Sequence, residues 1–251
     1  MFLLAAHLAH ASVITWTNPA SGGWNTAANW NPNQVPGASD SAVITSNGVV
    51  VTLNGATTVA GITLGGNFNC GAGGPQLVMN NQTLTLTGPF VINACGQFTL
   101  DSGSLTGNTN AFITGAFNWT GGFLAGNLTL TAGGTLTLAG AGNLDLPGCT
   151  LTNNGTVTWS SGTLRGGGTA IYNYGLWNAT GDQTWNNAYG GTTFNNLGTF
   201  RKSGGANPSY SLLTGGVIFN QAGGVLDVQT GSLVLQGGGN FTGGYTTTNS
   251  E

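Results

Sequence analysis

A motif that recurs about every twenty residues limits the fold of this chain more than any other feature. The motif opens with a glycine, has apolar residues at the second and fourth positions after it, a second glycine at the seventh and a leucine at the ninth. Four segments match it without gaps: residues 96–105, 115–124, 155–164 and 224–233. Partial copies open at Gly134, Gly175 and Gly198, so successive copies start 19 to 26 residues apart. Seven copies in register indicate a repeat protein.

Within each copy the residues alternate between apolar and polar, as at residues 83–87 and 135–138. This period of two, together with many threonines, predicts short β-strands that bury one face. Asn-containing segments at residues 151–155, 171–175 and 194–198 lead into copies of the motif, and Asn and Gly suit turns that need positive φ. Two short strands and tight turns fill each copy and leave no room for a crossover helix.

We therefore predict an all-β fold, a single-stranded parallel β-helix (a β-solenoid) of right hand with about 20 residues per coil. Leu, Val, Phe and Trp are expected to point into a narrow core, and Thr, Ser, Asn and Gln are expected to point outward. The expected organisation is a signal-peptide remnant at residues 1–11, a Trp-rich N-terminal cap at residues 12–45 and solenoid coils at residues 46–251.

Charged residues make up 4% of the 251 residues, whereas an ordinary soluble domain has about 25%. In a solenoid one position recurs on every coil, about 4.8 Å from its neighbours, so a charged position stacks like charges. Uncharged Asn and Thr can instead form ladders of hydrogen bonds. The scarcity of charge also argues against helices with a solvated face, and three basic residues are too few to bind nucleic acid or an anionic membrane surface.

Residues 1–11 form an apolar segment whose end, Ala9-His10-Ala11, resembles a signal-peptidase site. The segment is too short to span a bilayer, so we expect no membrane insertion. It predicts a secreted or cell-surface, extracellular protein, and the alternative is an apolar first strand. His7 and His10 belong to this segment and are not expected to bind a metal.

The three cysteines, Cys70, Cys95 and Cys149, lack C-x-x-C spacing, and the chain lacks partners for a zinc site. Cys70 and Cys95 are 25 residues apart, close to the length of one coil. A disulfide between neighbouring coils is one interpretation, and small buried side chains are the other. We predict no metal site and no cofactor.

Three tryptophans, Trp16, Trp24 and Trp30, lie close together before the first coil. They are candidate ligand-binding residues, because exposed indole rings can stack on the sugar rings of a glycan. The alternative is a hydrophobic plug, since an open coil exposes its core and its unpaired strand groups. Trp119 and Trp159 occupy the same position of the motif and are expected in the core.

A catalytic pair of carboxylates is not expected. Glycoside hydrolysis needs two carboxyl groups about 5–9.5 Å apart, which residues in one phase of the repeat could supply. The aspartates of the repeats, however, lie at different distances from their opening glycines: five residues for Asp101, eleven for Asp145, seven for Asp182 and three for Asp227. We predict no catalytic residues and no enzyme.

A polysaccharide lyase would need cations that neutralise uronate carboxylates, and Arg165, Arg201 and Lys202 are the only basic residues. Arg201 and Lys202 fall within an expected strand, with one side chain on each face. This arrangement favours a solvated edge charge over a lyase site.

The repeats resemble those of right-handed parallel β-helix proteins on bacterial surfaces, namely autotransporter passengers and filamentous-haemagglutinin-like adhesins. The segment from Trp16 to Asp40, with its spaced Trp residues and Pro36, is similar to the leading segment of large secreted bacterial repeat proteins. The resemblance implies a non-catalytic, adhesin-like structural protein of a bacterial surface or extracellular matrix. The alternative that it leaves open is a carbohydrate-binding or polysaccharide-active β-helix protein.

The last coil, which contains residues 237–245, shows no polar cap. This predicts either continuation in a longer protein or end-to-end self-association into filaments. The expected partners are therefore a second copy of the chain or surface glycans.

Overall fold

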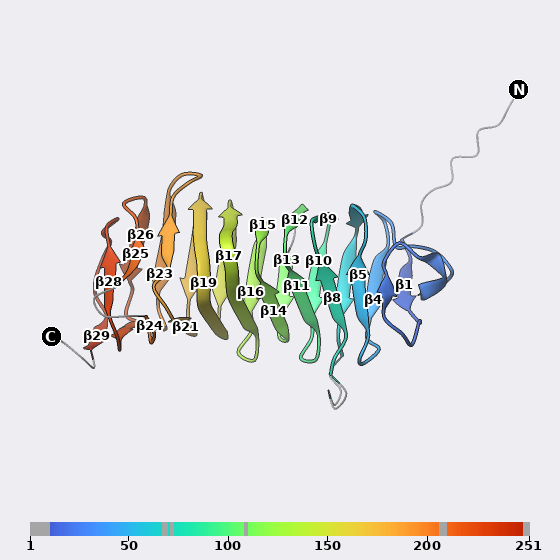
Figure 1. Cartoon of the computed structure of the whole chain (residues 1–251), viewed down its shortest axis with the longest axis horizontal. Helices are drawn as coiled ribbons and strands as arrows, with labels where there is room; N and C mark the ends of the chain where they lie inside the picture. Colours follow the sequence, from blue (N-terminus) through green and yellow to red (C-terminus); the bar gives the residue numbers. More distant parts are fainter. Residues whose placement is uncertain (1–10, 67–69, 71–72, 108–109, 206–209, 248–251) are drawn as a thin grey trace, which may run out of the picture.

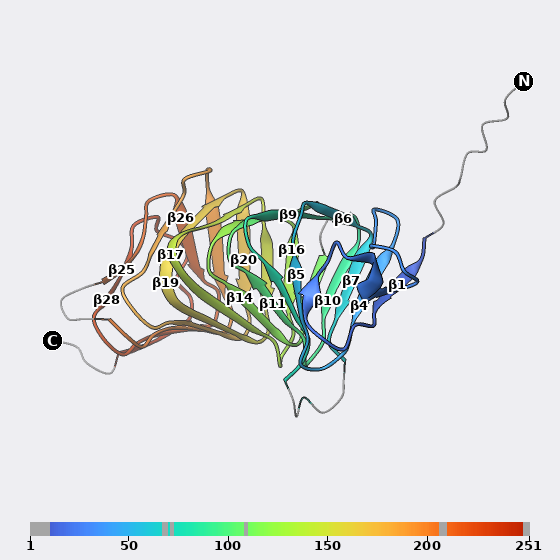
Figure 2. The same cartoon turned by 45° about the vertical axis from the view of Figure 1, so that its right-hand side comes forward.

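The chain forms a parallel β-solenoid (Figure 1), so the predicted all-β fold is confirmed. The computed structural model describes residues 11–66, 70, 73–107, 110–205 and 210–247. Within these residues the coils lie side by side in chain order, and a single 3-10 turn, η1 (Ala27–Asn29), accompanies the strands. Figure 2 shows the same coils wrapping around a common axis.

Each complete coil carries three strands, so the solenoid has three faces, which we number in chain order. The first face is a sheet whose described parallel strands are β1 (Val13–Trp16), β4 (Ser41–Ile44), β7 (Gly61–Leu64), β10 (Pro89–Ile92), β13 (Asn110–Ile113), β16 (Asn127–Leu130), β18 (Thr150–Asn153), β20 (Thr169–Asn173), β23 (Thr192–Asn196) and β26 (Val217–Gln221). Successive strands start 17 to 28 residues apart, a range that includes the predicted coil length.

The second and third faces form one continuous sheet. The second face contains β2 (Gly22–Gly23), β5 (Val50–Leu53), β8 (Gln76–Met79), β11 (Gln97–Leu100), β14 (Ala116–Trp119), β21 (Leu176–Ala179), β24 (Thr199–Lys202), β27 (Val225–Val228) and β29 (Gly244–Thr247). The third face contains β6 (Thr57–Val59), β9 (Gln82–Leu86), β12 (Gly103–Gly107), β15 (Gly122–Leu124), β22 (Thr184–Asn186), β25 (Tyr210–Leu213) and β28 (Ser232–Leu235). Two long strands, β17 (Thr135–Pro147) and β19 (Thr156–Gly167), bend around the corner and belong to both faces.

The sequence predicts two strands per coil, and this number is wrong because the second glycine of the motif divides each copy. Gly103, Gly122, Gly162 and Gly231 have φ angles of +91°, +86°, +88° and +61°. Glycine adopts this left-handed conformation without steric cost, so the chain can turn sharply there. The apolar residues before the glycine then point inward from the second face, and the leucine after it points inward from the third.

The opening glycine serves close packing, whereas the sequence predicts a turn of positive φ. Its described copies, including Gly155, Gly175 and Gly198, do not have positive φ. A Cβ atom on Gly155 would overlap the carbonyl oxygen of Gly134 in the preceding coil, and one on Gly175 would overlap that of Gly155. Glycine is therefore needed because the turns of neighbouring coils lie in direct contact at this corner.

The Asn-containing segments before several of these glycines supply a buried ladder of hydrogen bonds. Asn153 Nδ2 donates to Asn173 Oδ1 (2.7 Å), Asn173 Nδ2 to Asn196 Oδ1 (2.8 Å) and Asn196 Nδ2 to Gln221 Oε1 (2.9 Å). Each amide also donates to a backbone carbonyl of a neighbouring coil, at Leu176, Thr199, Val225 and Gly244 respectively. The four side chains are fully buried, and these bonds offset the cost of placing them there.

The solenoid begins inside the segment predicted as a cap, residues 12–45. Strands β1 and β2 pair in parallel with β4 and β5, so they belong to the first coil. Strand β3 (Trp30–Asn31) instead pairs antiparallel with β1 and covers the edge of the first sheet. An uncovered edge would expose unpaired backbone groups. The covering segment is therefore the part of the chain between β2 and β4.

Candidate functional site

The basic residues of the chain all form ion pairs with aspartates of a neighbouring coil. The pairs are Arg165 with Asp145, Arg201 with Asp227 and Lys202 with Asp182, at nitrogen–oxygen distances of 2.6, 2.7 and 2.8 Å. Stacked coils penalise like charges, whereas opposite charges on adjacent coils attract. Charge is therefore present in the coils mainly where its neighbour neutralises it.

The first pair lies on the outer surface of the third face and includes a tyrosine. Arg165 donates from Nε and Nη2 to the two carboxylate oxygens of Asp145, at 2.6 and 2.7 Å. The Tyr189 hydroxyl donates to Asp145 Oδ2 at 3.0 Å, and the guanidinium carbon of Arg165 lies 5.4 Å from the centre of the Tyr189 ring. Hydrogen bonding to Asp145 is the main reason why the pKa of Arg165 and that of Tyr189 are both raised.

The second pair lies on the outer surface of the second face. Asp227 accepts hydrogen bonds from Arg201 Nε (2.7 Å), Gln229 Nε2 (2.9 Å) and Thr246 Oγ1 (3.1 Å). Burial raises the pKa of Asp227, but these three donors outweigh burial and hold its pKa below the ordinary value. Residues Arg201 and Asp227 each lie three positions after the opening glycine of their copies, so their pairing could have been found in the sequence.

Lys202 occupies an inward position that follows Trp159 and Ala179 in the preceding coils. Its side chain is fully buried. The ammonium group donates to the carbonyl oxygens of Gly181 (3.0 Å) and Gly204 (2.6 Å) and to Asp182 Oδ1 (2.8 Å). All three of its donors are used, so Lys202 ties together two corner loops. As the strand pattern predicts, Arg201 and Lys202 point to opposite faces.

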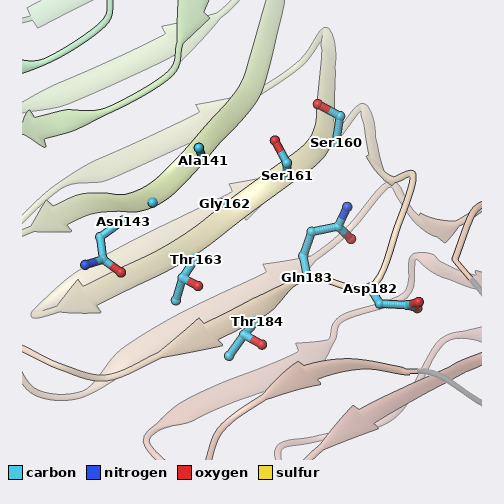
Figure 3. A pocket seen from close by; sticks show the side chains of 10 residues that line it. Ala141, Asn143, Ser160, Ser161, Gly162, Thr163, Asp182, Gln183 and Thr184 are labelled. Carbon is cyan, nitrogen blue, oxygen red and sulfur yellow. The ribbon is translucent and has the colours of Figure 1, made fainter.

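A polar groove lies at the corner between the second and third faces. We call it the corner groove; it is bounded by residues 141–143, 160–163 and 182–184 of three successive coils and has a volume of about 480 Å³. Figure 3 shows hydroxyl and amide side chains along these strands, with the Asp182 carboxylate pointing away from Thr163. The sequence analysis missed this groove. Its one signal there is the 21-residue spacing from Gly134 to Gly155, two residues longer than the two spacings before it.

The outer surface of the first face is a second candidate site, because its described strands expose no charged side chain. One column of paired residues runs across all ten strands: Thr15, Val43, Thr63, Val91, Phe112, Thr129, Thr152, Tyr172, Asn195 and Asn220. The parallel column holds Val13, Ser41, Gly61, Pro89, Asn110, Asn127, Thr150, Ala170, Thr193 and Ile218. Phe112 is 47% exposed and Tyr172 is 38% exposed. We call this surface the uncharged face.

The structure places the three predicted glycan-binding tryptophans in the interior. Trp16, Trp24 and Trp30 are at most 1% exposed. Trp30 contacts both others edge to face, with ring centres 5.1 Å from Trp16 and 4.9 Å from Trp24. Buried rings offer no surface to a sugar, so this arrangement favours the alternative interpretation, a plug over the first coil. Trp119 and Trp159 are likewise buried in the core.

The aspartates do not come together as a catalytic pair would. Asp145, Asp182 and Asp227 each bind a different cation, and Asp101 Oδ1 accepts a hydrogen bond from Thr120. Asp40 organises the N-terminal covering segment, where it accepts hydrogen bonds from backbone N–H groups, including that of Gly37. Their chemical role in this structure is to neutralise cations and to hold loops.

Comparison with known proteins points to a bacterial surface protein. No family model matches the chain, and no solved structure matches it. The chain resembles an autotransporter adhesin. It is 29% identical over 235 residues to the adhesin BmaC autotransporter of Brucella suis biovar 1 (strain 1330), a match that covers 82% of this chain and 7% of the adhesin. The resemblance inferred from the repeats is thereby supported by an independent match.

Cys70 and Cys95 form a disulfide, with their Cα atoms 5.6 Å apart. The bond links the segment before β8 to the turn before β11 on the next coil. Cys149 is a free, buried thiol, and burial raises its pKa to about 12. A thiol with so high a pKa forms little thiolate at neutral pH and is chemically inert.

Two further searches concern the described part of the chain alone. It contains no group of three or more His, Cys, Asp or Glu residues suited to a metal ion. It also contains no helix long and apolar enough to cross a membrane. The predicted signal-peptide remnant, with His7 and His10, lies outside the described residues except for Ala11.

Proposed function

We propose that this chain is a non-catalytic, adhesin-like β-solenoid of a bacterial surface, and that its uncharged face contacts the target. The observation that carries the proposal is the absence of charged side chains from this face across ten described strands. The similarity to an autotransporter adhesin supports it. The chain spans 7% of that adhesin, so we propose the adhesive role for this solenoid segment.

Contact through this face avoids the main cost of bringing two surfaces together. Charged groups lose hydration when they are buried, and the centres of protein interfaces are accordingly poor in charge and rich in aromatic residues. The uncharged face has this composition, with Phe112 and Tyr172 exposed among Thr and Asn residues. It can therefore be covered by a target without leaving an unpaired charge.

The size of the face predicts that one copy binds weakly. Nine steps of about 4.8 Å and a width of four residues give an area of roughly 560 Å². A standard stable interface uses about 800 Å² per partner. We infer that adhesion depends on many copies displayed together, since avidity multiplies weak contacts.

Two features support a secreted, non-enzymatic protein. The Cys70–Cys95 disulfide is typical of proteins that leave the reducing cytoplasm. The carboxylates of the ion pairs are held by cations on the neighbouring coils, which leaves them poorly suited to act as general acids.

The proposal can be tested by displaying the chain on a non-adherent bacterial strain and counting cells retained under flow on cultured epithelial cells and on glass. In one variant Thr129→Lys and Thr152→Glu place an opposite-charge pair on adjacent strands of the uncharged face. We expect retention to fall at least five-fold, because the new charges must lose hydration on contact.

The matched control carries Thr137→Lys and Thr158→Glu, the same pair on adjacent strands of the second face. We expect this variant to retain cells within two-fold of the unaltered chain. Retention no greater than that of cells without the chain on either surface, or equal losses from both variants, would contradict the proposal.

A further inference from the structure

We propose that the corner groove binds a neutral oligosaccharide. This site is separate from the uncharged face: it lies where the second and third faces meet, and it is formed by three successive coils. The inference rests on a local irregularity of the solenoid, on hydrogen-bonding groups without protein partners and on the balance of charge around the groove.

The solenoid departs from its regular corner at this place. In β17 the register against β19 shifts twice, between Leu138 and Asn143, so that four steps along β17 are matched by two along β19. Such bulges re-aim side chains and often lie beside functional sites. The bulged segment contains Ala141 and Gly142, whose small size leaves room above the strands, and a Cβ atom on Gly142 would meet nothing within 4 Å.

The walls of the groove carry hydrogen-bonding groups that the protein does not use. Within the described residues, the side chains of Asn143, Ser161, Thr163 and Thr184 form no hydrogen bond to another group of the chain. Asn143 and Thr163 are register partners on adjacent coils, and Thr184 follows on the next coil. Hydroxyl and amide groups repeated at the coil spacing of about 4.8 Å can bond to the hydroxyls of successive sugar units in an extended chain.

The charges beside the groove cancel, which selects a neutral ligand. Asp182, on one side, is paired with Lys202, and Asp145, two residues beyond Asn143, is paired with Arg165. No excess cation remains there to attract a sulfate, phosphate or uronate group. A ligand rich in hydroxyl groups matches this surface, whereas a polyanion gains nothing from it.

An exposed aromatic ring adjoins the groove. Tyr189 is 48% exposed, and its hydroxyl bonds to Asp145 while the Arg165 guanidinium lies over its ring. The ring is held in place by these contacts before any ligand binds. A sugar that extends past Asn143 would meet a fixed aromatic side chain, which favours stacking at little cost in entropy.

Isothermal titration with neutral hexasaccharides of glucose, mannose, galactose and xylose tests the proposal, with heparin hexasaccharide and hexagalacturonate as charged probes. We expect at least one neutral hexasaccharide to bind and the charged probes to bind more weakly. The double variant Thr163→Val and Thr184→Val removes two hydroxyls and keeps the side-chain shape, so we expect Kd to rise at least five-fold. Gly142→Met fills the open space and is expected to abolish binding.

Two matched controls carry the same chemical changes elsewhere. Thr129→Val with Thr152→Val removes two hydroxyls from the uncharged face, and Gly215→Met adds a side chain at a second glycine whose Cβ meets nothing within 4 Å. Both should leave Kd within two-fold, and circular dichroism of every variant checks the fold. The proposal is overturned if no neutral hexasaccharide binds, if the charged probes bind more tightly, or if the groove variants and the controls behave alike. Because the adhesion test alters other residues, either proposal can fail while the other stands.

Discussion

The coils before Thr135 and the coils after it are stabilised by different interactions. The N-terminal coils have an interior of Leu, Ile, Val and Phe side chains, a plug of three tryptophans at their end and the Cys70–Cys95 disulfide. The C-terminal coils add the Asn ladder and the three ion pairs described above. In the N-terminal coils a polar interior position would have no partner above or below it, whereas in the C-terminal coils each such position has one.

The comparison teaches that polar groups enter a solenoid interior in series. At the position of Asn153 the preceding coil has Leu130, and the ladder begins there. Gln221 ends the described ladder, where its longer side chain reaches the carbonyl oxygens of Gly224 and Gly244. Because each amide satisfies its neighbour, a single substitution leaves unpaired groups on two coils.

The largest effect expected concerns apolar packing in the N-terminal coils. Phe117 lies between Phe98 and Leu136 in one inward column and is 1% exposed. Replacing it with alanine (Phe117→Ala) should lower the free energy of unfolding by about 4 kcal/mol, because it leaves a cavity. Denaturant unfolding measures the loss, and amide hydrogen exchange should locate it in β11, β14 and β17. Faster exchange centred on the C-terminal coils would contradict this division of the molecule.

Loss of the disulfide should have the next largest effect, and it should also be confined to the N-terminal coils. The bond closes a loop of 25 residues, for which chain entropy predicts a stabilisation of about 3 kcal/mol. We expect Cys95→Ser to lower the stability of β8 and β11 by that amount, read from hydrogen exchange. The control is Cys149, whose buried thiol should resist alkylation in the folded protein.

A break in the Asn ladder tests the C-terminal coils in the same way. Asn173→Leu leaves Asn196 Oδ1 and the carbonyl oxygen of Thr199 without their donor. We expect a loss of about 2–3 kcal/mol, with faster exchange in β18, β20 and β23. Asn118→Leu, on the outer surface of the second face, is the control and should change stability by less than about 0.5 kcal/mol. Equal effects of the two substitutions would show that the ladder does not stabilise these coils.

The smallest effect expected is a pH dependence confined to the C-terminal coils. Because the folded-state pKa of Asp227 lies below its ordinary value of 3.8, its contribution to stability is complete above that pH. The contribution is lost as the pH falls from 3.8 through the lowered folded-state pKa. Exchange rates in β24 and β27 should therefore rise at low pH, and Asp227→Asn should remove that rise. A similar rise in β11 and β14 would mean that another group is responsible.

The motif predicted much of the fold because its residues act locally. The alternation of apolar and polar residues predicted which side chains are buried, including Trp119 and Trp159. The number of strands per coil was mispredicted because a glycine at positive φ and one in close contact look the same in a sequence. The structure separates them: Gly162 turns the chain, and Gly155 admits the carbonyl of the coil before it.

The candidate sites were harder to predict because they depend on which residues of different coils become neighbours. Asp145 and Arg165 lie at unequal distances from their opening glycines, and the bulge in β17 brings them into register. The same bulge forms the corner groove. The tryptophans near the N-terminus could be exposed or buried as far as their spacing showed, and β3, by folding back on β1, surrounds them.

The sequence by itself determined that this chain coils, with about twenty residues per turn, an apolar interior and little charge, because these properties follow from a motif repeated along one strand direction. The tertiary structure alone decided which charges pair, where the coil is irregular and which surfaces stay open to a ligand. Those outcomes depend on register between coils, and a shift of one or two residues, as in β17, changes every neighbour across the corner without changing the motif.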